Sequence, residues 1–432
     1  MKAIISNRIY FKPPSEEYLQ NLVQTLTYKI EGKRITGKKT VVNVETIRNC
    51  KLLAGGVVSI PQGRTDLIPP DYEIEDRRVT NSVPFPLARF PLRDSQQDIY
   101  DQVEDTCFIN ALVGWGKTFT ALHLARKFEQ KTLIITHTTM LRDQWVEEIE
   151  KLFGMRPGII GSGQFDIEDH FIVVGNVQTV TKHILKLSKE FGTVILDEAH
   201  HVPAETFSSI IDGMYSRYRI ALSGTLNRTD GKQVVFRDYF GSKIYKPPQS
   251  GTLNPIVKIL QTGMYLPPTS NWVQKINNLL YDSDYQDFVS AIAKSQIDAG
   301  HKVLIVADRT EFLESIKGNL GEDCALITGS TSFEERKAII ERVEKDEVLC
   351  IAGSRQIFSE GISVNKLSCV ILPVPTANLV NLEQIIGRVM RTHKDKKDPL
   401  VVDLAFSSPS EKRQLATRTA FYLEKGWDIS YV

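Results

Sequence analysis

The chain has 432 residues, of which 42% are hydrophobic and 24% are charged, with a formal net charge of +1. This length is too great for one ordinary hydrophobic core, so we expect two or three domains of a soluble globular protein. No apolar run is long enough to span a bilayer, and Met1–Ile4 does not open the long apolar stretch of a secretory signal. We therefore expect an intracellular, cytoplasmic protein with no membrane partner.

The five cysteines are scattered and form no Cys-x-x-Cys pair. This spacing favours buried, reduced thiols over disulfides or a structural zinc site. A net charge near zero argues neither for nor against a nucleic-acid partner, because a local basic patch can lie within a neutral total.

Residues 1–88 differ from the rest of the chain. A basic stretch from Lys29 to Lys39 is bounded by β-rich runs such as Thr40–Val44, and a proline-rich segment follows. We expect a small, separate domain of mixed α and β structure. The basic stretch is equally compatible with a solvated surface and with contact to a nucleic acid.

From about residue 89, short β-branched runs alternate with longer amphipathic stretches, which is typical of a parallel sheet with crossover helices. The pattern occurs twice. The predicted fold class is therefore α/β, with one domain at 89–245, a linker or insertion at 246–275 and a second domain at 276–432. The expected strands are Cys107–Ile109, Thr132–Ile135, Phe171–Val174, Thr193–Leu196 and Arg219–Leu222, then Lys302–Val306, Ala325–Thr328, Val348–Ala352, Cys369–Leu372 and Leu400–Leu404.

The first expected strand leads into Ala-Leu-Val-Gly-Trp-Gly-Lys-Thr at 111–118, and a helical pattern follows. A strand, a glycine-containing loop and a helix form the context of a phosphate-binding loop. The two glycines can turn successive N–H groups toward a phosphate, Lys117 can reach the β- and γ-phosphates, and Thr118 can bind Mg²⁺. Trp115 either stacks on a base or packs in the loop. The residues predicted here to bind the nucleotide are Val113, Gly114, Trp115, Gly116, Lys117 and Thr118.

The sequence Asp197-Glu198-Ala199-His200 directly follows the expected strand Thr193–Leu196. The two carboxylates therefore project from the carboxyl end of a parallel strand. We expect Asp197 to hold Mg²⁺ and Glu198 to polarise the attacking water. Together with the glycine loop, this pair predicts hydrolysis of a nucleoside triphosphate. A glycine turn beside a surface acidic cluster is the structural alternative.

The second domain lacks a phosphate loop but carries Gln384-Ile-Ile-Gly-Arg-Val-Met-Arg391. Residues three apart share one face of a helix. If that face meets the first domain, Arg388 and Arg391 reach the γ-phosphate and stabilise the developing charge, and Gln384 orients the attacking water. An exposed basic helix is the alternative for the two arginines alone.

Taken in order, these motifs resemble those of superfamily 2 helicases, over nearly the whole chain after residue 90. In the segment that resembles the adenine motif, Arg93 and Gln96 match the base-contacting positions. Thr136–Trp145 and Asn176–Thr179 are similar to elements that contact the nucleic-acid backbone. Ser223–Thr225 resembles the motif that couples the ATP state to strand contact.

In the second domain, Ala307–Arg309, Thr328–Ser330 and Ala352–Ile362 resemble motifs IV and V, and Gln384–Arg391 resembles motif VI. The resemblance implies two tandem RecA-like domains with a small N-terminal domain of the DNA-binding type, and ATP and Mg²⁺ as cofactors. It adds Glu360 and Gly361 to the ATP-binding residues. The DNA contacts that it implies are Thr138, Thr139, Gln178, Thr179, Arg228, Arg309, Thr328, Ser354 and Phe358.

Within the superfamily, Ser359–Ser363 followed by Val364–Leu367 resembles the phage UvsW-type helicases, with the XPB and RecG types as more distant relatives. Those helicases remodel branched DNA, so the resemblance implies forks or Holliday-type junctions as substrates, in the host cytoplasm if a phage encodes the chain. We expect an ATP-dependent DNA helicase that unwinds such DNA or moves its branch point.

Three alternatives remain open: a duplex translocase with little unwinding, an RNA helicase, and a nucleotide-gated DNA clamp with vestigial hydrolysis. A strand-separating helicase also needs an element that wedges the duplex. Candidates are residues 228–231, residues 246–270 and Phe358, for which a position in the core is the competing interpretation.

Overall fold

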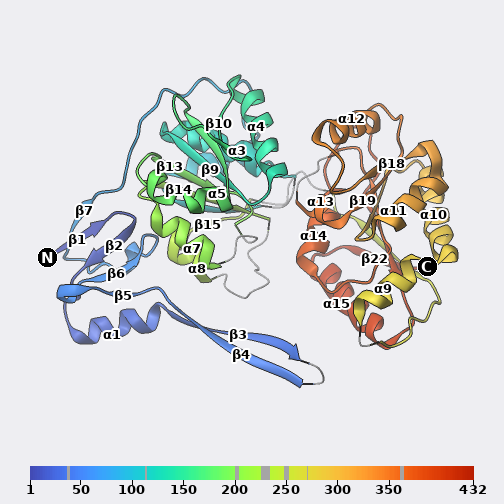
Figure 1. Ribbon diagram of the computed structural model, residues 1–432, viewed down its shortest axis with the longest axis horizontal. Coiled ribbons are helices and arrows are strands. Elements are labelled where there is room, and N and C mark those ends of the chain that lie inside the picture. The colour runs from blue at the N-terminus through green and yellow to red at the C-terminus, as the bar shows by residue number, and fades with distance from the viewer. Residues whose placement is uncertain are drawn as a thin grey trace. The chain divides into compact units, whose positions relative to one another are not determined.

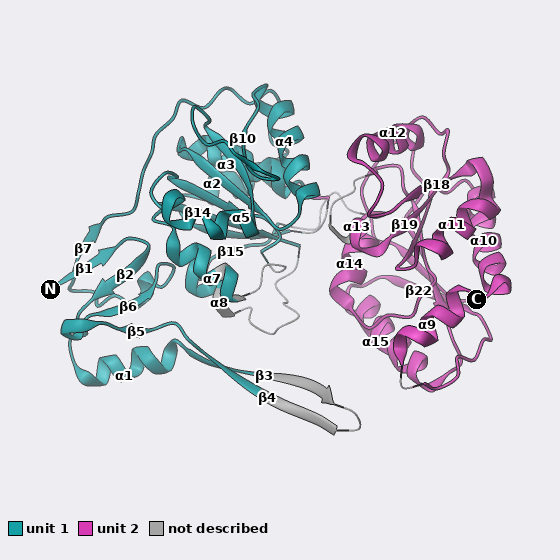
Figure 2. Ribbon diagram, viewed as in Figure 1, with its two compact units in different colours: residues 1–112, 116–250 teal, residues 113–115, 251–432 magenta. Residues whose placement is uncertain are grey.

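The computed structural model describes residues 1–36, 39–111, 114–199, 204–224, 234–247, 253–269, 271–360 and 364–432, without the side chains of 31–36, 39–43, 204, 207, 234–235 and 359–360. The chain, traced in Figure 1, divides into two compact units. One unit comprises Met1–Leu112 and Gly116–Ser250, and the other comprises Val113–Trp115 and Gly251–Val432 (Figure 2). In the described part of the chain, no helix is long and apolar enough to cross a membrane.

The first unit begins with a small sheet and a helix. Their elements are β1 (Lys2–Ile5), β2 (Arg8–Phe11), α1 (Glu16–Thr25), β5 (Lys51–Leu52), β6 (Val58–Pro61) and β7 (Glu73–Asp76). The strand order is β5-β6-β2-β1-β7, in which β1 and β7 pair in parallel and the other pairs are antiparallel. Ile9, Phe11 and Leu22 are among the buried side chains of its core. The predicted mixture of α and β structure is thus confirmed.

A second, two-stranded sheet carries the basic stretch. It is an antiparallel hairpin of β3 (Thr27–Thr36) and β4 (Lys39–Arg48), paired from Thr27 opposite Arg48 to Thr36 opposite Lys39. Two short 3-10 helices, η1 (Ala54–Gly56) and η2 (Thr65–Leu67), complete this part of the chain. At the base of the hairpin, Ile47 packs against the core of the larger sheet described next.

The larger sheet of the first unit has the strand order β11-β10-β12-β9-β13-β14-β8-β15, and all pairs except β10–β11 are parallel. The five predicted strands are confirmed, and the central ones are buried along their whole length, as in a parallel sheet covered on both faces. The strands are β8 (Cys107–Asn110), β9 (Thr132–Thr136), β10 (Gly158–Gly161), β11 (Gln164–Phe165), β12 (Ile172–Asn176), β13 (Thr193–Leu196), β14 (Tyr218–Ser223) and β15 (Ile244–Tyr245). The helices are α2 (Asp94–Gln102), α3 (Lys117–Phe128), α4 (Thr139–Phe153), α5 (Val177–Lys182), α6 (Ile184–Leu187), α7 (Ala204–Gly213) and α8 (Val234–Phe240).

Charged side chains fasten the N-terminal sheet to two helices of the larger sheet. Arg8 Nη1 donates to both carboxylate oxygens of Asp212 on α7, at 2.7 Å each. Asp238 on α8 is fully buried and accepts from Arg64 at 3.1 Å, Asn49 at 2.6 Å and Tyr28 at 2.9 Å. Because both aspartates are paired across this contact, the N-terminal residues form one compact unit with the sheet that follows.

The sheet of the second unit has the order β18-β19-β17-β20-β21-β16-β22, and every pair is parallel. The five predicted strands are again confirmed. The strands are β16 (Ile256–Gln261), β17 (Val303–Ala307), β18 (Cys324–Ile327), β19 (Cys350–Ser354), β20 (Cys369–Leu372), β21 (Leu400–Ala405) and β22 (Asp428–Tyr431). The helices are α9 (Trp272–Leu280), α10 (Ser283–Asp298), α11 (Thr310–Leu320), η3 (Gly321–Asp323), α12 (Phe333–Glu344), α13 (Arg355–Glu360), α14 (Leu379–Gly387) and α15 (Pro409–Glu424).

Strand β16 lies inside the segment 246–275 that the sequence suggested as a linker or insertion. It pairs in parallel with β21 and β22, so this part of the segment belongs to the second sheet. Its residues alternate between exposed and buried, and prolines flank the run on both sides. The segment therefore lacks the continuous apolar run that predicted five other strands of this sheet.

Candidate active site

The glycine loop lies between β8 and α3, as predicted. Gly116 caps α3 with a φ of 97°, and Gly114 has a φ of 91°. Both values lie in the left-handed region that favours glycine. A Cβ atom at Gly116 would collide with the Gln96 side chain and lie 3.4 Å from Arg93 Nη2. Glycine is therefore required here for two reasons, and the two residues of the adenine motif lie beside the loop.

Gln96 is held at this place by its own helix. Its side-chain Oε1 accepts from the backbone N–H of Arg93 at 3.0 Å, across the first turn of α2, and its Nε2 lies 3.5 Å from Gly116 O. The side chain is buried. The structure thus brings Arg93, Gln96 and the loop together, which is the arrangement that a nucleotide site requires.

Lys117 opens α3 and is buried. Its Nζ donates to Ala111 O at 3.0 Å and lies 3.8 Å from Glu198 Oε1. A buried ammonium is costly unless it is paired, so the loop carbonyl and the glutamate keep this cation in place. This contact also joins the loop to the Asp197-Glu198 pair, about eighty residues away in the sequence.

Asp197 directly follows β13 and is buried. Its Oδ1 accepts from the backbone N–H of Glu198 at 2.9 Å, and its Oδ2 accepts from Trp145 Nε1 at 2.7 Å. Burial, and then the charge of Glu198, raise the pKa of Asp197 to about 6. Glu198 itself has a φ of 44°, a left-handed conformation that costs roughly 1 kcal/mol or more for a residue other than glycine. Such strain is typical of functional turns.

These residues fit a Mg²⁺–nucleotide complex. Mg²⁺ prefers oxygen ligands and is usually held by one or two carboxylates together with phosphate oxygens and water. Asp197 supplies a carboxylate whose charge is destabilised by burial, and Thr118 supplies a hydroxyl in the first turn of α3. The described residues contain no group of three or more His, Cys, Asp or Glu side chains that could hold a metal alone. A cation shared with a phosphate agrees with this ligand set.

Trp145 is a residue of this site that the sequence did not single out, although it lies within the segment that resembles a backbone-contacting motif. It belongs to α4, and its side chain is 1% exposed. The sequence signal was a tryptophan at an apolar position of a helix, which predicts burial. It does not predict which acceptor the indole N–H finds.

The predicted nucleic-acid contacts of the first unit lie along one edge of its sheet. Thr138 and Thr139 follow β9, and Gln178 and Thr179 lie in α5, which follows β12. Since β12, β9 and β13 are parallel neighbours, these ends share an edge with Asp197. Thr139 and Gln178 are exposed. Thr138 caps α4 through a hydrogen bond from Leu141 N at 3.2 Å, so its hydroxyl has a structural role whatever else it contacts.

The second unit repeats this arrangement. Arg309 follows β17, Thr328 follows β18, and Ser354 ends β19, and these three strands are parallel neighbours. Arg309 Nε donates to Asn277 Oδ1 at 2.6 Å, and Thr328 Oγ1 lies 2.9 Å from Ser330 Oγ. Polar residues thus lie at the carboxyl ends of the strands, where parallel sheets place their binding sites.

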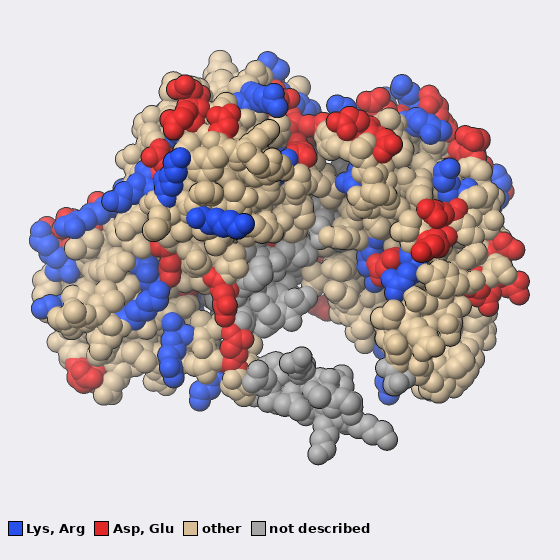
Figure 3. All heavy atoms as spheres, in the orientation of Figure 1, with Lys and Arg blue, Asp and Glu red and all other residues tan. Residues whose placement is uncertain are grey.

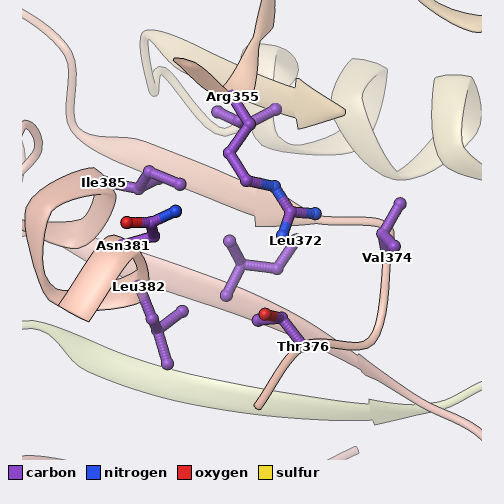
Figure 4. A pocket seen from close by; sticks show the side chains of 8 residues that line it. Arg355, Leu372, Val374, Thr376, Asn381, Leu382 and Ile385 are labelled. Carbon is purple, nitrogen blue, oxygen red and sulfur yellow. The ribbon is translucent and has the colours of Figure 1, made fainter. Parts of the chain in front are cut away.

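A small pocket opens beside this edge of the second sheet (Figure 4). Arg355 extends into it, with Asn381 and Ile385 of α14 on one side and Val374 on the other. Arg355 Nε also lies 3.3 Å from Asp308 Oδ1, just after β17. The pocket therefore places a guanidinium among apolar side chains at the strand ends.

The helix-face argument for Arg388 and Arg391 is only partly right. Helix α14 ends at Gly387, because Arg388 N and Val389 N bond three residues back, to Ile385 O and Ile386 O. Arg391 therefore lies beyond the helix. Gln384 and Arg388 are buried, and Arg388 Nε donates to Phe358 O at 2.8 Å. Their catalytic roles stay predictions.

Phe358 does not offer a ring to nucleic-acid bases. Its side chain is fully buried, and its ring packs directly on Gly353, where any Cβ atom would collide with it. The prediction that Phe358 stacks on DNA or wedges the duplex is therefore wrong, and its competing interpretation as a core residue is confirmed.

The remaining predicted residues are either buried or lie outside the part of the chain that the structure describes. Trp115 is buried, which agrees with packing in the loop. Val113, Arg228 and Gly361 lie outside the described residues, as does the side chain of Glu360. On the face of the molecule in Figure 3, Lys and Arg are interspersed with Asp and Glu. The case for a nucleic-acid contact therefore comes from the strand ends.

Comparisons with known proteins agree with these features. The family model described as "Type III restriction enzyme, res subunit" matches residues 89–228, and "Helicase conserved C-terminal domain" matches residues 285–393. The probable helicase D10 of Escherichia phage T5 is 42% identical over 436 residues, which cover 99% of this chain and 95% of that protein. The ATP-dependent DNA helicase uvsW of Enterobacteria phage T4 is 27% identical over 343 residues, covering 72% of this chain and 68% of that protein.

Among solved structures, S. cerevisiae Dbp5 bound to RNA and ADP BeF3 is 12% identical, with a TM-score of 0.58, and the match covers 78% of this chain and 89% of that chain. This likeness supports the assignment of both larger sheets to RecA-like domains. The two family models and the phage relative that matches over nearly the full length indicate one family. The Gly-x-Gly-Lys-Thr loop beside Asp197 and Glu198 agrees with it. The chain belongs to the superfamily 2 helicases.

Proposed function

We propose that this protein is an ATP-dependent DNA helicase that unwinds forked and junction DNA or moves the branch point of such DNA. The observation that carries the proposal is the shared edge of the first sheet. The strands β13 and β8 end at the residues predicted to bind ATP, and β9 and β12, which follow β13 in the sheet order, end at the residues predicted to contact a nucleic acid. The binding of nucleotide and the binding of a nucleic-acid strand therefore both depend on residues at the ends of adjoining β-strands.

The residues of the first unit divide the chemistry of ATP hydrolysis. Gln96 and Arg93 hold the base, and the N–H groups of the loop surround the phosphates. Lys117 leaves Glu198 for the β- and γ-phosphates, which frees the glutamate to polarise a water molecule. Asp197 and Thr118 would hold Mg²⁺, which when bound would neutralise charge on the phosphate oxygens. The 3.8 Å distance between Lys117 Nζ and Glu198 Oε1 supports this division of roles, because it places the two side chains at one site.

The second unit contributes Gln384, Arg388 and Arg391. In this proposal the two arginines stabilise the charge that develops on the transferred phosphoryl group, an effect worth roughly 10³–10⁵ in rate. Binding and release of ATP then change how the two units hold a nucleic-acid strand. A nucleic-acid strand held at the carboxyl ends of the β-strands of both sheets moves stepwise. Such a grip on phosphates carries little sequence information and weakens with salt.

DNA as the substrate is supported by the similarity to the ATP-dependent DNA helicase uvsW of phage T4, and branched DNA is what the resemblance of Ser359–Leu367 to UvsW-type helicases implies. The basic hairpin β3–β4, of the N-terminal part, is the element that we propose to contact the duplex arm. Residues 228–231 and the parts of 246–270 outside β16 remain candidates for the separating element, and residues 228–231, 248–252 and 270 lie outside the described residues.

Strand displacement on labelled substrates tests the proposal. The substrates are a tailed DNA duplex, a replication-type fork, a four-way junction and an RNA duplex of the tailed type. Glu198→Gln is the inactive variant, and Glu205→Gln, an exposed residue on α7, is the matched control. We expect ATP-dependent separation of the fork and junction by the wild type and by Glu205→Gln.

Loss of that separation in Glu198→Gln would support the proposal. DNA-stimulated ATP hydrolysis without separation would make the protein a translocase and overturn the helicase proposal. Faster separation of the RNA duplex than of any DNA substrate would overturn the assignment to DNA.

A further inference from the structure

A buried hydrogen bond connects helix α4 to the carboxylate that the proposed function assigns to Mg²⁺. Trp145 Nε1 donates to Asp197 Oδ2 at 2.7 Å, and both side chains are buried. The residues are 52 positions apart in the sequence. They come together because β9, which precedes α4, and β13, which precedes Asp197, are parallel neighbours.

We infer that Trp145 is a positioning residue for the metal ligand, whose indole N–H fixes the Asp197 carboxylate in the orientation that binds Mg²⁺. The inference rests on the proposed ATP site and does not depend on which nucleic acid the protein unwinds.

The hydrogen bonds of Asp197 define the plane of its carboxylate. Oδ2 accepts from Trp145, and Oδ1 accepts from the backbone N–H of Glu198 at 2.9 Å. A carboxylate has about four lone-pair sites, so one donor on each oxygen stops rotation about the side-chain bond and leaves sites for a cation. The backbone donor alone would leave Oδ2 unconstrained.

The chemical nature of the donor matters as much as its position. An indole N–H donates and carries no charge, so it orients Asp197 without neutralising it. An arginine or lysine at the same place would satisfy the carboxylate and compete with Mg²⁺. A neutral donor is therefore the kind of partner that a metal-binding carboxylate needs.

Packing makes Trp145 a stiff support. Its ring is among the largest fully buried side chains of the described residues, and α4 is a helix of 15 residues capped by Thr138. A ring held on all sides keeps its N–H direction, which is the requirement for positioning a ligand. The competing explanation is that a buried indole N–H simply needs an acceptor, with no consequence for metal binding.

Nucleotide binding with and without Mg²⁺ separates these explanations. The full-length protein is titrated against N-methylanthraniloyl-ATP in Mg²⁺ and in EDTA, and binding is followed by the anisotropy of the directly excited fluorophore. Trp145→Phe keeps an aromatic ring and removes the donor. Loss of such an outer-shell partner lowers metal affinity about 10- to 100-fold, so we expect the affinity gain due to Mg²⁺ to fall by roughly that factor.

Trp427→Phe is the matched control, because Trp427 is a buried tryptophan of the second unit that packs on Phe421 and Tyr422. It should leave the affinity gain unchanged. Asp197→Asn provides a second test. If Trp145 acts through Asp197, adding Trp145→Phe to Asp197→Asn should change the Mg²⁺ effect no further.

An unchanged Mg²⁺ effect in Trp145→Phe would overturn the inference, as would an equal loss of affinity in Mg²⁺ and in EDTA, since that result indicates a general structural defect. A further loss in the double variant would also overturn it. The proposed function fails separately: a wild type that binds Mg²⁺–nucleotide but separates no strands would refute the helicase proposal, while the binding ratio would still decide the role of Trp145.

Discussion

Two buried aspartates, Asp197 of the first unit and Asp403 of the second, accept hydrogen bonds from donors of different charge. In the second unit, Asp403 of β21 accepts from Arg418 through both oxygens at 2.8 Å, and from the Tyr422 hydroxyl at 3.0 Å. In the first unit, Asp197 accepts from a neutral indole and a backbone amide, and burial raises its pKa to about 6.

The difference teaches how a buried charge indicates its role. A carboxylate that a buried arginine neutralises stabilises its own domain and has little left to offer a ligand. A carboxylate that neutral donors only orient keeps an unbalanced charge, which a cation can use. Glu198 and Glu411 both face a buried lysine and differ in distance: Glu198 Oε1 lies 3.8 Å from Lys117 Nζ, whereas Glu411 Oε1 lies 2.7 Å from Lys275 Nζ.

The largest effect is expected from Glu198→Gln. Removal of a general base lowers turnover by roughly 10²–10⁴-fold, so ATP hydrolysis in the presence of DNA should fall by that factor. Glu411→Gln is the partner experiment in the second unit. It should reduce stability and leave turnover per folded molecule unchanged, as measured by steady-state hydrolysis normalised to the native fraction. Equal turnover losses in both variants would break the comparison.

Asp403→Asn should destabilise the second unit strongly. The substitution leaves the buried guanidinium of Arg418 without its countercharge, which costs about 3–5 kcal/mol. Differential scanning calorimetry of the full chain would measure the shift of the transition of that unit. A change below about 1 kcal/mol would show that Arg418 finds other acceptors and that its pair with Asp403 contributes little to stability.

Asp197→Asn should increase the free energy of unfolding in the absence of Mg²⁺ and nucleotide, whereas Asp403→Asn should lower it. It removes a carboxylate that is ionised at a cost of about 3 kcal/mol near neutral pH, but its amide NH₂ group faces one of the two N–H donors, which costs about 1–3 kcal/mol. We therefore expect the first unit to gain less than about 2 kcal/mol while hydrolysis is lost. Urea unfolding in EDTA, followed by the fluorescence of the four tryptophans, measures this gain. A loss of stability would mean that the lost acceptor costs more than the relief of the buried charge.

This gain should depend on pH. The pKa of Asp197 is raised from 3.8 to about 6 in the folded state, so the folded protein holds the proton more tightly than the unfolded chain does. The contribution of Asp197 to the free energy of unfolding is therefore present in full below its unfolded pKa and is lost as the pH rises through about 6. The advantage of Asp197→Asn should grow across this window and then level off.

The smallest effect is expected at an exposed carboxylate. Asp346 lies 3.1 Å from Lys302 Nζ and 3.0 Å from Lys366 Nζ, but its side chain is 59% exposed. Asp346→Asn should change the free energy of unfolding by less than about 1 kcal/mol, because solvent and salt screen such pairs. The same calorimetric scans measure this change. A value above about 1 kcal/mol would contradict the expectation that exposed pairs contribute less to stability than buried ones.

Much of the fold followed from the sequence because its strands are continuous apolar runs. Thr193–Leu196 and Cys369–Leu372 were predicted with the ends that the structure gives them. The glycine loop and Asp197-Glu198 were equally accessible, since each motif depends on its position at a strand end. Strand β16 was missed because it alternates between exposed and buried residues beside prolines.

The rest depended on contacts between distant segments. Periodicity shows that Trp145 is buried but does not identify Asp197 as its acceptor. Phe358 lies in the segment that resembles motif V, yet its ring packs in the core, because a motif resemblance does not fix the direction of a side chain. The helix that was expected to carry Arg391 ends at Gly387, a boundary that capping decides and that the sequence marks weakly.

The pairing of Arg8 with Asp212 and of Arg64 with Asp238 has a consequence for how this motor could be divided. The two aspartates lie on the helices that follow the Asp197-Glu198 and Ser223-Gly224 segments. A shortened chain beginning near residue 89 would retain both carboxylates, lose both arginines, and open the surface around Asp238 to solvent, because Tyr28, Asn49 and Arg64 all contact it. The first 88 residues thus complete one compact unit with the sheet that follows them, and their removal would uncover part of that unit as well as delete a domain.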